Sequence, residues 1–254
     1  MKKVFKCCFA VLLLVVTMCG LYKYNNQQEI GNNKIVEENN KKNIFIIDKI
    51  IAYSNANAKK NENNQRADWE LSIYQYTDLA IYIKINQTDD DRESNIKSIS
   101  IENMKILQNP KLGTPVLGAK KIRDFGKDEN EIKESISNIN FELLEKQDSI
   151  ENSEYPFKKD GSIPLTITYF NNNIKEKYII SDITQALTFD GSLLRRARIP
   201  IDAIKSKIGL TVKIVNELQE EYIATVEFDL PITEELYEGS QTVIIDSKQE
   251  FEIF

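Results

Sequence analysis

Apolar and polar residues alternate with a period of two in short runs through most of the chain. About a dozen such runs occur after residue 44, separated by segments rich in Asn, Asp and Gly. This pattern is typical of β-strands with one buried face. The predicted strand segments are 44–53, 69–73, 79–85, 96–107, 139–143, 165–169, 178–180, 208–215, 221–230, 242–246 and 251–254. No long segment has apolar residues at helical spacing, so the sequence predicts an all-β fold with one or two β-sandwiches.

Polar clusters between these runs are interpreted as turns and boundaries. Thr77-Asp78 and Asn171-Asn172-Asn173 each separate two alternating runs, and such residues favour tight turns, so each pair of runs is a predicted hairpin. Residues 54–67 are interpreted as a loop. The polar stretch 148–162 is a plausible boundary between two β-sandwich-like halves, 44–147 and 163–254, which share an interface.

The start of the chain has a different pattern. Lys2, Lys3 and Lys6 precede an unbroken apolar run over 7–22. As a helix this run spans roughly 24 Å, against about 30 Å of hydrocarbon. We interpret 1–24 as an uncleaved signal anchor, a single transmembrane helix in the plasma membrane. The lysines place the bulk of the chain on the extracytoplasmic side. Residues 25–43 are mostly Asn, Gln, Glu and Lys and are expected to form a disordered stalk.

Three alternatives to the anchor stay open. Val16, Thr17, Cys19 and Gly20 resemble a lipoprotein processing site, which implies lipidation at Cys19, although Met18 stands where that motif has a small residue. A cleaved signal peptide requires an A-x-A-like site, which is missing. The run is also compatible with a buried helix of a cytosolic protein.

Charge and composition limit the partners and the chemistry. The formal net charge is −6, and residues 25–254 carry 29 basic and 39 acidic groups, so no nucleic-acid partner is expected. The chain contains no histidine, and its three cysteines lie within 7–19. These absences exclude histidine-dependent nucleophilic catalysis and the usual zinc, copper and iron ligand sets. We therefore expect a protein that has no cofactor and no enzymatic activity. The alternative is an enzyme that uses a pair of carboxyl groups for catalysis.

Two sets of residues are candidate ligand-binding sites. Tyr74 and Tyr76 lie on the strand face opposite to Leu71 and are candidates for an exposed platform that stacks on sugar rings. Arg195, Arg196 and Arg198 form a basic patch on a predicted strand, and their guanidinium groups suit carboxylate or phosphate. The alternative for the arginines is an edge strand that charge protects against aggregation.

One acidic loop is a candidate metal site. Asp89, Asp91 and Glu93 present oxygen ligands at alternate positions, as Ca²⁺ requires. The spacing departs from an EF-hand, because no glycine occupies the sixth position and Ser100 stands where the closing glutamate belongs. A solvated loop is the alternative.

The segment 178–196, which contains Phe189-Asp190-Gly191-Ser192-Leu193-Leu194-Arg195-Arg196, resembles uncharacterised exported proteins of low-GC Gram-positive bacteria. These proteins have no assigned activity, so the resemblance implies topology and location only. The resulting hypothesis is a membrane-tethered extracytoplasmic binding or structural protein, whose partner is a protein or a cell-wall glycan. A carbohydrate-binding module and a carboxylate-dependent cell-wall enzyme are the alternatives.

Overall fold

The computed structural model describes residues 43–60, 69–128, 132, 134–151, 153–180 and 188–254. The expected anchor, Cys19 and nearly all of the expected stalk lie outside these residues. Residues 43–254 form one compact unit. Its strands are β1 (Phe45–Lys60), β2 (Trp69–Ile85), β3 (Ile96–Gln108), β4 (Thr114–Ala119), β5 (Ile139–Leu144), β6 (Pro156–Lys158), β7 (Leu165–Ile180), β8 (Lys207–Asn216), β9 (Glu221–Asp229), β10 (Gln241–Glu250) and β11 (Glu252–Ile253).

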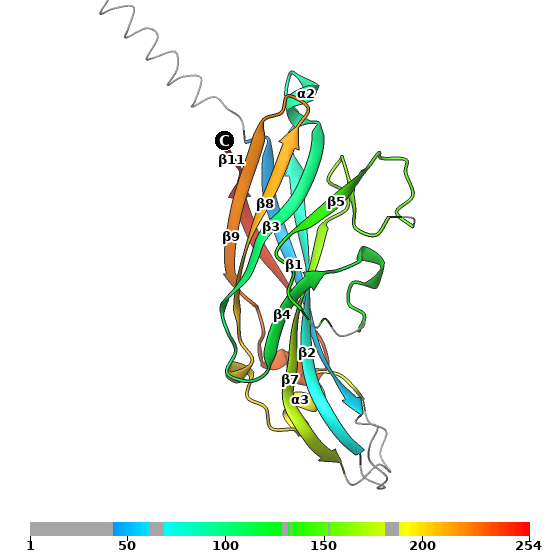
Figure 1. The fold of residues 1–254 in the computed structure, drawn as a ribbon, viewed down its shortest axis with the longest axis vertical. Helices are drawn as coiled ribbons and strands as arrows, with labels where there is room; N and C mark the ends of the chain where they lie inside the picture. The colour runs from blue at the N-terminus through cyan, green and yellow to red at the C-terminus, as the bar shows by residue number, and fades with distance from the viewer. Residues whose placement is uncertain (1–42, 61–68, 129–131, 133, 152, 181–187) are drawn as a thin grey trace, which may run out of the picture. The chain divides into compact units, whose positions relative to one another are not determined.

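The described strands form two sheets, which confirms the prediction of an all-β, sandwich-like fold (Figure 1). One sheet has the order β10-β1-β2-β7-β4, and the other has the order β11-β9-β8-β3-β5-β6. Apolar side chains from both sheets pack into one main core, with Ile50, Leu79 and Tyr169 from the first sheet and Ile101 and Val212 from the second. Each sheet contains strands from both expected halves, so the halves 44–147 and 163–254 are not separate sandwiches in this unit.

The two predicted hairpins are wrong, because each is a single long strand. β2 continues through Thr77 and Asp78, and β7 continues through Asn171. These polar residues are buried and find polar partners instead of water: the hydroxyl groups of Thr77 and Ser54 are 2.8 Å apart. Ile73 and Leu79 have the same parity and both lie in the main core, as a continuous strand requires.

Two further differences concern the length of β1 and the regularity of β3. β1 extends to Lys60, through part of the segment that was expected to be a loop. In β3 the buried positions change parity between Ile101 and Met104, where Asn103 has a φ of 53° and the pairing with β8 is irregular. An extra residue of this kind is a β-bulge, which moves the following side chains to the other face.

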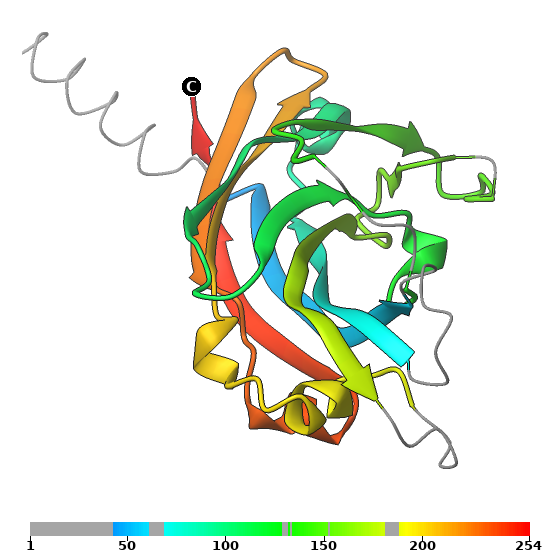
Figure 2. The ribbon, with the colours of Figure 1, turned by 60° about the horizontal axis from the view of Figure 1, so that its bottom comes forward.

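The short helices lie toward two different ends of β8 and β9. At one end lie α2 (Asp91–Ser94) and the start of the described chain, where the Phe45 ring packs on Tyr222 with centroids 4.9 Å apart. At the other end lie the connections that contain α3 (Ser192–Arg196), η2 (Ile201–Ala203) and η3 (Glu234–Glu238), in yellow to orange at the bottom of Figure 2. The other short helix, η1 (Ile122–Asp124), follows β4.

Candidate functional site

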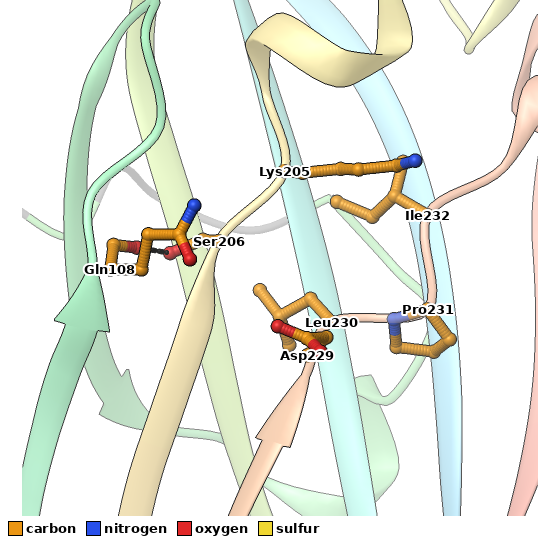
Figure 3. Close-up of a pocket in the computed structure, with 7 residues that line it drawn as sticks. All are labelled: Gln108, Lys205, Ser206, Asp229, Leu230, Pro231 and Ile232. Atoms are coloured by element: carbon orange, nitrogen blue, oxygen red, sulfur yellow. Dashed lines mark hydrogen bonds between the residues drawn. The ribbon is translucent and has the colours of Figure 1, made fainter.

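Two adjacent cavities lie where β8 begins and β9 ends. The first, of about 360 Å³, is formed by the ends of β3 and β9, the residues before β8 and those after β9, as Figure 3 shows. Its lining residues are Gln108, Lys205, Ser206, Asp229, Leu230, Pro231 and Ile232. The second, of about 330 Å³, is lined by Pro200, Ile201, Asp202, Lys205, Ile232, Thr233, Glu234 and Tyr237. Because both cavities share Lys205 and Ile232, we treat them as one groove and name it the β8–β9 groove.

Hydrogen bonds hold the walls of this groove in place. The backbone N–H of Leu230 donates to the carbonyl oxygen of Ser206 at 2.9 Å, which joins the two connections. The Ser206 hydroxyl donates to the carbonyl oxygen of Gln108 at 2.6 Å. On the other wall, the Tyr237 hydroxyl donates to the Ile199 carbonyl oxygen at 2.7 Å. The groove is therefore preformed, as binding pockets usually are.

The base of the groove is apolar and anchored in the core. Ile201, Leu230 and Ile232 line the groove and are buried in the main core. Pro200 and Pro231 lie on its walls and restrict the backbone there. An apolar base with polar groups along its walls suits a ligand that has both kinds of surface.

The charges along the groove are unbalanced. Lys205 Nζ is 2.6 Å from Asp202 Oδ1, and the ammonium group holds the pKa of this carboxyl below its usual range. Asp229 and Glu234 are exposed and form no ion pair with any described residue. The Lys205–Asp202 pair is neutral overall, and the Lys111 ammonium group also acts on Asp202. Asp229 and Glu234 are therefore the groove carboxylates without an ion pair to a described residue.

Buried polar residues lie behind the groove on the inner face of the first sheet. Gln241 accepts a hydrogen bond from the backbone N–H of Thr233 at 3.0 Å, and its own Nε2 has no partner among the described residues. Burial raises the pKa of the Tyr169 hydroxyl to about 12, and the adjacent Ser206 opposes this shift. The alternating pattern did not indicate this region, because its groups come from the ends of several strands and from the connections between them.

The predicted aromatic platform is wrong. Tyr74 and Tyr76 lie on the face opposite to the core, as expected, but they are only 7% and 3% exposed. Their rings stack on Phe170 at centroid distances of 4.9 and 6.3 Å and form a second apolar cluster with Val116. The segment 120–128 contacts this face, and the Tyr74 hydroxyl donates to Asp128 Oδ2 at 2.5 Å. Rings buried in this way cannot stack on a sugar.

A buried ion pair attaches this segment to the sheet. Lys120 Nζ lies 3.2 Å from Asp78 Oδ2, and the two residues are 5% and 0% exposed. Asp78 also accepts from the backbone N–H of Gly126 at 2.8 Å, and Lys120 donates to the Lys127 carbonyl oxygen at 2.8 Å. Burial raises the pKa of Asp78, and the Lys120 ammonium group opposes this shift.

This pair borders a third cavity of about 240 Å³, which Tyr76, Lys120, Thr168 and Phe170 help to line. The hydrogen bonds of Lys120 are directed to Asp78 and to the backbone of the covering segment. We therefore assign the pair a structural role, in which it holds residues 120–128 against the sheet.

The predicted strand for the arginines is also wrong, because residues 192–196 form α3. Asp190 Oδ1 accepts from the backbone N–H of Ser192 at 2.9 Å and fixes the start of this turn. Arg195 forms an ion pair with Glu238 and donates to the Tyr237 carbonyl oxygen at 2.9 Å. Arg196 and Arg198 are exposed, and neither lines the groove. Of the three arginines, the structure thus places Arg195 beside a residue that lines the groove, Tyr237.

The acidic candidates lie at α2. Asp91 and Glu93 belong to this turn, and Asp89 is exposed before it. Asp90 caps the turn and forms an ion pair with Arg92 at 2.7 Å. Within the described residues, no group of three or more potential metal ligands is placed to hold an ion.

Comparisons with known proteins add no family. No protein-family model, curated protein or solved structure matches the chain. In the described part of the chain, no helix is both long and apolar enough to cross a bilayer.

Proposed function

We propose that the chain is a membrane-tethered extracytoplasmic binding protein, held by residues 7–22 as a single span, and that the β8–β9 groove receives its partner. The apolar run with its flanking lysines supports the tether. The absence of histidine, and of cysteine beyond residue 19, favours binding over catalysis. The compact unit of residues 43–254, with its preformed groove, supports a binding role.

The main support for the proposal is that the groove and the first described residues lie at opposite ends of β9. The described chain enters beside Tyr222 of β9, and Asp229 at the other end of β9 lines the groove. A strand rises about 3.3 Å per residue, so these two residues are about 23 Å apart along β9. The described chain therefore enters the folded unit at the end of β9 opposite to the groove.

The two alternative functions receive less support. A carboxylate-dependent hydrolase requires two carboxyl groups in one cleft, one with a raised pKa. Asp78 has a raised pKa, but its partner is the Lys120 ammonium group. The carbohydrate-binding hypothesis was based on Tyr74 and Tyr76, and both rings are covered.

Fractionation with mass spectrometry tests the tether. The expected result is an intact chain in the membrane fraction that retains its original N-terminus and resists extraction at high pH. Recovery of the full chain in the soluble cytosolic fraction would contradict the proposal. A mature form that begins at an acylated Cys19 would keep the tether and replace the transmembrane helix by a lipid.

A further inference from the structure

Building on the proposed binding function, we infer that the β8–β9 groove binds an extended, basic segment of a polypeptide. The two cavities that form the groove are contiguous through Lys205 and Ile232. Each cavity lies near the lower end of the range for typical ligand pockets, about 300–1,000 Å³, so a ligand that fills both has to extend from one into the other.

The charges that line the groove indicate that its ligand is positively charged. Asp229 lies in the first cavity and Glu234 in the second, and neither has an ion-pair partner within the described residues. The ammonium group of Lys205 is engaged by Asp202. A ligand with cationic groups at intervals can place one beside each free carboxylate, whereas an anionic ligand meets two like charges.

The apolar base favours lysine or arginine side chains over a simple cation. Ile232 and Pro231 lie between the two carboxylates along the chain and line the groove. Lysine and arginine have long aliphatic stems, which pack on apolar surface while the charged end stays in water. A metal ion or ammonium has no such stem and leaves the partly exposed Pro231 uncovered.

The hydrogen-bonding groups favour a polypeptide over a polyamine. Ser206 and Gln108 line the first cavity, and the Gln108 side-chain amide offers both a donor and an acceptor. A peptide backbone supplies carbonyl acceptors and N–H donors along its length, and a polyamine supplies only donors.

Binding of defined peptides to the full-length chain in non-ionic detergent tests the inference. The probe is a fluorescent Lys-Val-Lys-Thr-Lys-Val peptide, compared with a matched peptide that has Glu at each Lys position. Fluorescence anisotropy should show saturable binding of the basic peptide only, which weakens as salt is raised and screens the charges.

The variant Asp229→Asn/Glu234→Gln should lower the affinity by up to about 25-fold, because one exposed ion pair strengthens an interaction by up to about fivefold and the two factors multiply. The matched control Asp246→Asn/Glu252→Gln removes the same charge from exposed positions on β10 and β11. This control should bind like the unmodified chain. Unchanged urea midpoints of both variants show that the fold is intact.

Three results would overturn the inference: equal binding of the acidic peptide, equal losses in the two double variants, or complete displacement of the peptide by equimolar spermidine. The assay uses purified protein and does not depend on cellular location. If the peptide does not bind, the proposed membrane tether is therefore unaffected. If fractionation contradicts the tether, the peptide-binding assay still tests the groove.

Discussion

Replacing Lys120 by methionine should destabilise the fold strongly, because it leaves the charge of Asp78 buried without its partner. Asp78 is 0% exposed, and the ammonium group at 3.2 Å is its cationic neighbour. Removing one member of a buried ion pair typically costs about 3–5 kcal/mol. Because a domain is stabilised by only about 5–15 kcal/mol, this loss is a large fraction of the total. The second apolar cluster should loosen as residues 120–128 detach.

The magnitude follows from what remains around the carboxylate. In Lys120→Met, Asp78 retains the hydrogen bond from the Gly126 N–H and loses the ammonium group that offsets its burial. The double variant Asp78→Val/Lys120→Met removes both charges at similar volume. Such replacements are often neutral or stabilising, so the double variant should be more stable than the single one.

Urea unfolding of the full-length chain, followed by the fluorescence of Trp69, measures both effects. Trp69 is the only tryptophan and stacks on Phe189 at a centroid distance of 6.1 Å, so its emission reports loss of the fold. Lys97→Met is the matched control, because Lys97 is exposed and its ammonium group donates to Gln219. The control should change the free energy of unfolding by less than about 0.5 kcal/mol. If Lys120→Met costs no more than Lys97→Met, the structural role of the pair is refuted.

Three further predictions follow from the same structure. Because the pKa of Asp78 is raised in the folded state, the contribution of Asp78 to stability is present at low pH and is lost as pH rises through the folded-state pKa. Asp78→Asn should therefore flatten the pH dependence of urea unfolding over that range. Tyr76→Ala should destabilise the fold by about 3–5 kcal/mol, as expected for a buried ring, without changing retention on wall polysaccharide; lost retention with an unchanged urea midpoint would restore the platform hypothesis. Gly191→Ala should destabilise the fold by about 1–3 kcal/mol, because a Cβ there would lie 1.9 Å from the Leu236 carbonyl oxygen. Gly209→Ala, whose Cβ would meet side-chain atoms only, those of Leu107 at 3.1 Å and Lys105 at 3.5 Å, should cost less in thermal unfolding. The reverse order would contradict the packing of α3 on η3.

The sequence was sufficient to predict the class of fold, because period-two alternation depends only on which face of a strand is buried. It also assigned Tyr74 and Tyr76 correctly to the face opposite Leu71. Local pattern could not show that residues 120–128 cover this face, since that contact joins positions more than forty residues apart in the chain. Thr77 and Asp78 were misassigned for a related reason: their partners Ser54 and Lys120 are distant in sequence.

The groove was missed because its residues come from the ends of strands and from the connections between them. Asp229 lies at the end of the predicted strand 221–230, and Pro231 follows that strand. Polar residues and proline at such positions ordinarily indicate only that the strand ends. The shared parity of Ile73 and Leu79 was the one available signal that Thr77-Asp78 is not a turn. A hairpin connection of arbitrary length does not preserve parity, whereas a continuous strand without a β-bulge does.

Protease treatment of intact cells tests the central claim most directly, because the claim is that residues 43–254 lie outside a membrane crossed by residues 7–22. The account predicts that the C-terminal portion is degraded from the outside while a cytosolic marker survives. An uncut C-terminal portion in intact cells, which becomes degradable only after lysis, would contradict it.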